Sequence, residues 1–427
     1  PAISQIDING AKEFTKENLK DGLKTAGISE AKIFDRSLLD RAEKEIKRQY
    51  TSRGFYSAKV SSTVTPIERN RISLTFTIEE GEVSRIVDIN IIGASAFSES
   101  TLLKEFELTT GGWFSWFTKD DQYSKQKLSG DLEKLKSYYL NRGYLEFNIE
   151  STQVSITPDK EKIYITVNIA EGPVYKITDI KFQGELKITE AEMRSLLLFS
   201  PGETFSRQKI VDSVKRISDR LGNDGYSFAN INPVPDPDRV NKTASFTMFV
   251  DPGRRVHVRR INVQGNSRTR DEVVRRELRQ LESAWYSNEK IARSKERLER
   301  TSFFEDITIE TPSVPGTNDQ VDLNVTVKER NTGSLQFGIG YSNAEKLTIS
   351  ASVSQANIFG SGNQLSFRIN NSTISKAYEV SYLNPYWTVD GIARGFDLYQ
   401  RDLNTASLNT GSYNSSSSGV GVRFGDR

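Results

Sequence analysis

The sequence contains no cysteine and a single histidine, His257. Without cysteine the chain has no disulfide, no thiol nucleophile and no cysteine zinc site, and this absence suits a compartment in which stray thiols would oxidise. One histidine, at an alternating position of an expected strand, excludes a histidine-based triad and a histidine metal site. The segments Gly338-Ile339-Gly340 and Gly360-Ser361-Gly362 lack the following helix that a phosphate-binding loop requires. We therefore expect no enzyme, no bound metal and no cofactor.

Long hydrophobic runs and a dominant charge are missing as well. No segment approaches the roughly 18 apolar residues of a transmembrane helix. The 58 basic residues are balanced by 56 acidic ones, and the two signs are interleaved along the expected helices, so no nucleic-acid partner is implied. The chain opens at Pro1 without the basic and apolar regions of a signal peptide, which indicates that an export signal was removed or that the gene starts earlier.

What the chain does have is one pattern that occurs four times. A glycine follows a short alternating strand at Gly10, Gly93, Gly184 and Gly265, and this marker glycine recurs about every 80 to 90 residues, a period typical of small domains in tandem. A short helix, a loop and a long amphipathic helix come next. The long helix ends at a second glycine, such as Gly143, as helices commonly do. Two further strands complete each copy.

The order strand, helix, helix, strand, strand predicts an α+β module in which two helices cover one face of a three-stranded sheet, because this arrangement buries both apolar stripes. The last strand of each copy runs into a charged or glycine-containing exit, which sets the boundary between modules. We expect the four modules at residues 1–81, 82–172, 173–253 and 254–330.

Residues 331–427 have a different composition, in which glycine, serine, asparagine and aromatic residues replace helix formers. Alternation such as that in Ser334–Ser342 gives the expected strands one apolar and one polar face, which a soluble sandwich would share. Strands near ten residues, Gly-Ser-Asn turns and aromatic residues such as Tyr386 favour transmembrane strands of a β-barrel. About six strands fit, fewer than the roughly eight of the smallest closed barrel, so the barrel is incomplete and we expect an N-terminal portion of a longer chain.

Over its whole length the chain resembles the BamA family of outer-membrane protein assembly factors, within the Omp85 superfamily. The segments that carry the resemblance are Trp113–Asp121, Val256–Gly265, Arg275–Gln280 and Asn384–Gly391. The resemblance implies that the modules are polypeptide-transport-associated (POTRA) domains, the second to fifth of the family's five, ahead of a sixteen-stranded barrel. Arg394-Gly395-Phe396 has the letters of the family's barrel-loop motif, but it lies on an early strand and is not assigned that role.

This resemblance implies a central subunit of the machinery that inserts β-barrels into the cell outer membrane, with the POTRA domains in the periplasm. The partners it implies are accessory outer-membrane lipoproteins, unfolded outer-membrane β-barrel proteins, outer-membrane lipid and, as a further candidate, periplasmic chaperones. Two alternatives remain open. An Omp85-type pore that secretes polypeptides usually has fewer modules and lacks the Trp113–Asp121 loop, and a soluble periplasmic scaffold would stay monodisperse without detergent.

The edges of the small sheets are the first candidate site, because an unpaired edge strand can accept an extended segment by strand addition. In the second module the candidate edge is Phe147–Thr157, with Ile149, Thr152, Val154 and Ile156. In the third module the corresponding stretch contains Pro233, Pro235 and Pro237, and proline cannot donate to a ladder. We predict that the second module adds a strand and the third does not. The alternative is that both are ordinary protected edges.

The first barrel strand is the second candidate site. Gly333, Gly338 and Gly340 weaken it, because glycine adds backbone entropy and no cross-strand side-chain contact. The resemblance implies that this strand is the seam of the barrel, which opens to accept a substrate strand. Alternatively, the glycines only let large neighbours pack.

Two further segments are candidate partner-binding sites. The loop Gly111–Asp121 contains Trp113, Trp116 and Phe117, and so much exposed aromatic surface indicates contact with a partner or the membrane, unless the loop closes over its own module. Arg275, Arg276 and Glu277 lie where the family docks an accessory lipoprotein, although a charged run is also typical of a solvated helix face.

Overall fold

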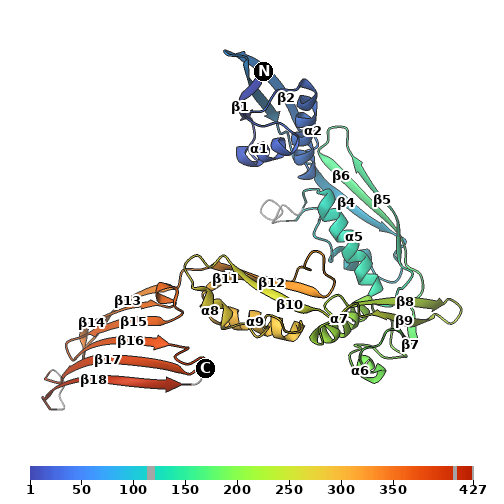
Figure 1. Cartoon of the computed structure of the whole chain (residues 1–427). Coiled ribbons are helices and arrows are strands. Elements are labelled where there is room, and N and C mark those ends of the chain that lie inside the picture. The colour runs from blue at the N-terminus through green and yellow to red at the C-terminus, as the bar shows by residue number, and fades with distance from the viewer. Residues whose placement is uncertain (113–120, 407–410, 426–427) are drawn as a thin grey trace. The chain divides into compact units, whose positions relative to one another are not determined.

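The structure is a computed structural model that describes residues 1–112, 121–406 and 411–425. Within these residues it contains four three-stranded sheets and one six-stranded sheet (Figure 1). The predicted order of strand, helix, helix, strand, strand is confirmed in all four modules.

The elements of the modules follow one another in the same order. The first module has β1 (Ala2–Asn9), α1 (Lys16–Thr25), α2 (Arg36–Ser52), β2 (Lys59–Ile67) and β3 (Arg71–Glu79). The second has β4 (Arg85–Ile92), α3 (Glu99–Leu103), α5 (Lys125–Leu140), β5 (Asn148–Ile156) and β6 (Lys162–Ala170). The third has β7 (Lys176–Gly184), α6 (Glu190–Ser195), α7 (Arg207–Asn223), β8 (Asn230–Asp238) and β9 (Thr243–Asp251). The fourth has β10 (His257–Gln264), α8 (Asp271–Arg275), α9 (Asn288–Arg300), β11 (Phe304–Glu310) and β12 (Gln320–Glu329).

The last strand of each module lies in the centre of its sheet. The strand orders are β1-β3-β2, β4-β6-β5, β7-β9-β8 and β10-β12-β11. In the first module β1 is parallel to β3 and β2 is antiparallel to it, because the two helices connect the parallel strands and a short turn connects the antiparallel ones. Each module therefore has two edges, one formed by its first strand and one by its second.

In the first, second and fourth modules, both helices and all three strands contribute to one hydrophobic core. In the first module Ile46 and Tyr50 of α2 are buried against Leu74 and Phe76 of β3, as the amphipathic period of the helix predicts. The side chain of Asp35 accepts a hydrogen bond from the Ser37 amide at 2.9 Å and so caps α2. In the described part of the chain, no helix combines the length and the apolar composition needed to cross a membrane.

The marker glycines are required by a close approach of two backbones. Gly10 has φ +85°, and a Cβ built on it would lie 2.0 Å from the carbonyl oxygen of Ile78 in β3. The same collision recurs at the other three marker glycines, with the carbonyl oxygens of Ile169, Val250 and Val327 at 2.0 to 2.2 Å. Any side chain here would push the loop away from the central strand, which explains why glycine stands in all four copies.

A glutamate just after the central strand ties that strand to the loop that follows the marker glycine. In the first module Glu80 Oε1 accepts hydrogen bonds from the amides of Lys12 (2.6 Å) and Glu13 (2.9 Å) and from the hydroxyl of Tyr50 (2.8 Å). Burial of this carboxyl raises its pKa, but the amide and hydroxyl donors together outweigh burial, and the pKa of Glu80 lies below its ordinary value.

The same arrangement occurs in the second and fourth modules. Glu171 accepts from the Ala96 amide at 3.0 Å, and Glu329 accepts from the Thr269 amide at 2.6 Å. Burial raises and these donors lower the pKa of Glu329, with a net shift downward. In the third module the equivalent position is Pro252. In three modules a glutamate carboxylate thus joins the central strand to the loop, a contact that the sequence patterns did not predict.

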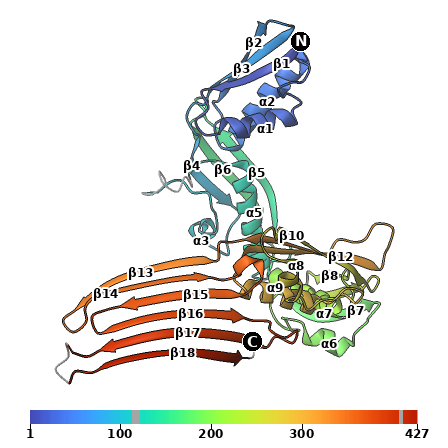
Figure 2. The same ribbon diagram turned by 60° about the vertical axis from the view of Figure 1, so that its left-hand side comes forward.

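The C-terminal segment forms an antiparallel sheet whose six strands lie side by side in chain order (Figure 2). Its elements are β13 (Gly333–Ser342), β14 (Lys346–Gln355), the short helix η1 (Ile358–Gly360), β15 (Gln364–Asn371), β16 (Ser375–Asn384), β17 (Ala393–Asn404) and β18 (Asn414–Gly425). One face carries exposed apolar side chains, among them Phe337, Val353, Phe367 and Leu398. The other carries polar pairs such as Arg423 with Asp397 at 2.6 Å. The predicted two-faced strands are confirmed.

Candidate functional site

The first-strand edge of each module is partly covered by the segment between its own two helices. In the first module Ile3 donates its amide to the carbonyl of Lys32 at 2.9 Å and accepts from the amide of Ala31 at 2.8 Å. The equivalent amides donate to the interhelix segment in the other modules, at Ile86, Ile177 and Val258. This segment acts as a very short extra strand, so the beginning of the first strand is not available to another chain.

The second-strand edges are open by comparison. Within residues 1–112, 121–406 and 411–425, no backbone hydrogen bond joins the outer side of β2, β5 or β11 to another segment. An edge of this kind presents a row of unpaired amides and carbonyls, and this is the surface that strand addition uses.

The edge strand β5 contains the four residues predicted to receive an added strand. The Thr157 amide donates to the carbonyl of Lys162 at 3.0 Å, so the amides of alternate residues up to Ser151 point to β6. The amides between them, from Thr152, Val154 and Ile156, point outward. The side chains of the four predicted residues differ in exposure. Those of Thr152 and Ile156 are exposed. Val154 and Ile149 are half-buried against the core.

The edge strand β8 is different, because three prolines alternate along it. Pro233, Pro235 and Pro237 all lie in β8, which pairs with β9. Since proline has no amide hydrogen, the residues between the prolines supply the donors to β9, and the prolines occupy the outward-facing positions. The outer edge of β8 therefore offers no amide donor from Pro233 to Pro237, in contrast to β5.

The three glycines of the predicted seam lie on β13, an edge strand of the six-stranded sheet that pairs with β14 along its whole length. A Cβ on Gly338 would lie 2.6 Å from the Ser350 hydroxyl, and one on Gly333 would lie 2.6 Å from the side chain of Gln355. A Cβ on Gly340 would meet nothing within 4 Å. A side chain at Gly338 or Gly333 would require the Ser350 hydroxyl or the Gln355 side chain to move, whereas one at Gly340 would meet no neighbour.

Arg276 and Glu277 lie just past the end of α8, and Arg276 contacts a turn of the six-stranded sheet. Glu277 is only 1% exposed and lies 3.1 Å from Arg297 of α9. Arg297 in turn donates to the hydroxyl of Tyr386 at 2.8 Å, and the guanidinium of Arg276 lies over the Tyr386 ring at 4.3 Å. Both residues thus have partners inside this chain, and their docking of a lipoprotein stays a prediction.

A second turn of the sheet contacts the same module through its backbone. The Arg270 amide donates to the carbonyl of Gly360 at 3.0 Å, and the Asn357 side chain donates to the Thr269 hydroxyl at 2.8 Å. A Cβ on Gly360, which has φ +70°, would lie 1.9 Å from the carbonyl oxygen of Arg268. We call this contact, together with the one at Tyr386, the turn joint. The sequence patterns predicted the Gly-Ser-Asn turn at Gly360 but did not reveal that this turn and the one at Tyr386 bind the fourth module.

Two further expectations concern the aromatic loop of the second module and the absence of a metal site. Trp113, Trp116 and Phe117 lie outside the described residues. Among the residues that are described, no cluster of three or more histidine, aspartate or glutamate side chains is arranged to hold a metal ion.

Comparison with known proteins identifies the modules. The family model of POTRA, described as a surface antigen variable number repeat, matches residues 1–81, 84–172, 175–253 and 256–330, and that of the Omp85 superfamily domain matches residues 357–427. Over 427 residues the chain is 35% identical to the outer membrane protein assembly factor BamA of Neisseria meningitidis, covering 99% of this chain and 54% of that protein. The chain belongs to the BamA family.

Other BamA proteins agree with this assignment. The BamA of Buchnera aphidicola is 31% identical, with 91% of this chain and 63% of that protein covered. The crystal structure of BamA from Haemophilus ducreyi lacking POTRA domains 1–3 matches with a TM-score of 0.54 and 34% identity, over 58% of this chain and 47% of that one. The chain spans about half the length of its meningococcal BamA relative. The POTRA modules of this BamA-family chain are periplasmic and its six-stranded sheet belongs to the outer membrane.

Proposed function

We propose that this chain belongs to the central subunit of a β-barrel assembly machinery, which receives unfolded outer-membrane proteins and inserts them into the outer membrane. The names of its relatives support this proposal, since they are outer membrane protein assembly factors. The work is non-covalent, so we expect no catalytic step and no cofactor.

The observation that carries the proposal is the open edge of β5. Three outward amides and the exposed side chains of Thr152 and Ile156 lie on it. An unfolded barrel protein consists of segments with alternating apolar and polar residues, and such a segment can pair with an edge strand through its backbone while its side chains alternate between the two faces. We propose that β5 adds such a strand and that β8, with its outward prolines, does not.

Delivery to the membrane is proposed to occur at β13. This strand is an edge of the six-stranded sheet, and Gly340 contributes no packing to it. A weakly paired edge strand is suited to exchange partners with a substrate strand.

Accessory lipoproteins are proposed to bind near Arg275, Arg276 and Glu277. The loop with Trp113, Trp116 and Phe117 is proposed as a second contact, for a partner or the membrane surface.

The absence of native cysteine allows a direct test of strand addition. A single cysteine at Thr152 in β5, or in a second variant at Val234 in β8, is offered to an unfolded outer-membrane protein that carries one cysteine in a barrel strand. The proposal expects disulfide capture at Thr152 and little at Val234. Equal capture at the two positions, or capture at Val234 alone, would contradict it.

A further inference from the structure

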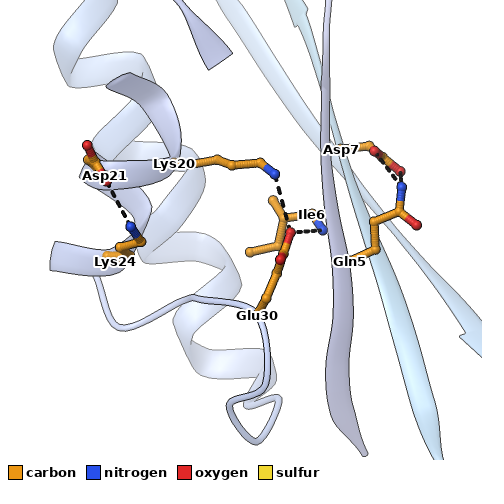
Figure 3. A network of polar contacts seen from close by, with 7 residues as sticks. All are labelled: Gln5, Ile6, Asp7, Lys20, Asp21, Lys24 and Glu30. Carbon is orange, nitrogen blue, oxygen red and sulfur yellow. Dashed lines mark hydrogen bonds and ion pairs between the residues drawn. The ribbon is translucent and has the colours of Figure 1, made fainter. Parts of the chain in front are cut away.

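The open part of the β1 edge is occupied by an ion pair from the same module. Beyond Ile3, whose backbone is already bonded, the next amide directed away from β3 is that of Ile6, which donates to Glu30 Oε1 at 3.4 Å. Lys20 of α1 holds the same oxygen at 3.2 Å. Figure 3 shows Glu30 between the lysine and the strand, whereas Gln5 and Asp7 bond to each other on the other side of β1.

The fourth module contains the same arrangement in a more complete form. The Ile261 amide of β10 donates to Glu282 Oε1 at 2.9 Å, and Arg275 Nη2 donates to the carbonyl of the same residue at 2.9 Å. Arg275 and Glu282 lie 3.6 Å apart. A neighbouring strand would bond to these two backbone groups, so the side-chain pair occupies the position of an added strand.

The positions of the two pairs in their modules are equivalent. Lys20 and Arg275 stand at the same distance along the chain from Ile6 and Ile261. Each glutamate directly precedes the interhelix segment that covers the beginning of the first strand, at Ala31 in the first module and Ser283 in the fourth. In the third module Pro201 precedes the corresponding segment, so a glutamate at this position is not a general requirement of the module fold.

Stability alone gives a poor account of these pairs. The side chains of Lys20 and Glu30 are 38% and 51% exposed, and those of Arg275 and Glu282 are 41% and 49% exposed. Ion pairs as exposed as these contribute little to folding because water screens them. Charged side chains placed on an edge are, however, a known means of preventing unwanted strand pairing.

We propose that Glu30 with Lys20 and Glu282 with Arg275 are edge guards that keep added strands off β1 and β10. Strand addition in these two modules is then confined to the opposite edge. The inference rests on the proposed function, since it specifies which edges a substrate uses. It also gives Arg275 a role within its own module, distinct from the docking of a lipoprotein.

The experiment uses the full chain and a synthetic peptide with the sequence of β14 that carries one cysteine. Single cysteines at Gln5 on β1 and Thr152 on β5 report disulfide capture, in the parent sequence and with Glu30→Ala. Asp21→Ala is the matched control, because Asp21 pairs with Lys24 on α1 at 2.9 Å and leaves Glu30 in place. Amide hydrogen exchange of β1 is measured in parallel, and Glu282→Ala is the second variant for β10.

We expect Glu30→Ala to raise capture at Gln5 and the exchange rate of the Ile6 amide by about tenfold, while Asp21→Ala changes neither. Equal capture at Gln5 in the parent and in Glu30→Ala would overturn the inference, provided that Thr152 captures the peptide. If neither site captures the peptide, the proposed strand addition is wrong, and the edge guards are then tested by amide exchange alone. Unchanged exchange rates at Ile6 in Glu30→Ala and at Ile261 in Glu282→Ala would refute the edge guards.

Discussion

Replacing Thr152 by proline is expected to weaken strand addition to β5 without unfolding the second module. The Thr152 amide points away from β6, and its side chain is exposed. Proline at this position therefore removes one donor from the outer edge and none from the sheet, as Pro235 does in β8. The equivalent edge strand β8 holds three prolines, so an edge strand of this module fold accommodates the φ near −65° that proline requires.

The size of the effect follows from the number of outward amides. A hydrogen bond of this kind contributes about 0.5 to 1.5 kcal/mol net, so loss of one weakens binding roughly two- to tenfold. Thr152→Pro combined with Ile156→Pro removes two of the three outward amides and should weaken binding by about 1 to 3 kcal/mol, or roughly five- to 150-fold.

The assay is binding of a fluorescent peptide with the β14 sequence to the full chain, together with thermal unfolding. Gln153→Pro is the matched control, because the Gln153 amide points to β6, where Gln153 is paired with Thr166. This control should lower the stability of the second module by about 1 to 3 kcal/mol, because it leaves a carbonyl of β6 without its donor, whereas Thr152→Pro should leave the stability nearly unchanged. Unaltered peptide affinity in the double proline variant, with the module folded, would refute the assignment of β5.

Three further predictions concern the seam, the turn joint and acid stability. Gly340→Val should strengthen the pairing of β13 by about 0.5 to 1 kcal/mol and slow insertion of barrel substrates into lipid vesicles by the complete assembly factor. Thr348→Val, opposite Gly340 on β14, is the control, and an equal insertion rate in the two variants would argue against a weak seam. Tyr386→Phe should keep the stacking on Arg276 but lose the bond from Arg297, about 1 to 2 kcal/mol, and so speed amide exchange in residues 384–392; unchanged exchange would speak against the joint. Because the pKa of Glu80 lies below its ordinary value, its contribution to stability is complete above about pH 4.5 and is lost as the pH falls through the folded-state pKa. Glu80→Gln should therefore weaken the dependence of the first module's unfolding free energy on pH in the acid range, and an unaltered pH profile would contradict this.

The order of elements in each module and the two faces of the C-terminal strands could be predicted from the amino-acid pattern alone. Helical periods of 3.6 residues and strand periods of two residues are local properties, so they can be read without knowledge of the partners. The marker glycines were visible for the same reason, although their cause, the carbonyl of the central strand, was not. The charged exits were visible too, and in three of the modules a glutamate there turned out to bind the loop amides.

Which strand edges are open, and which contacts close the others, depends on how segments distant in the chain pack together. Whether the amide of Thr152 points to β6 or outward depends on the pairing register with a strand further along the chain. The guard at Ile6 depends on a loop that returns to the strand, and the partners of Glu277 come from α9 and a distant turn. By sequence, Arg275, Arg276 and Glu277 form one charged run. In the folded module Arg275 binds a backbone carbonyl of β10 and Glu277 is buried, and only packing distinguishes the two.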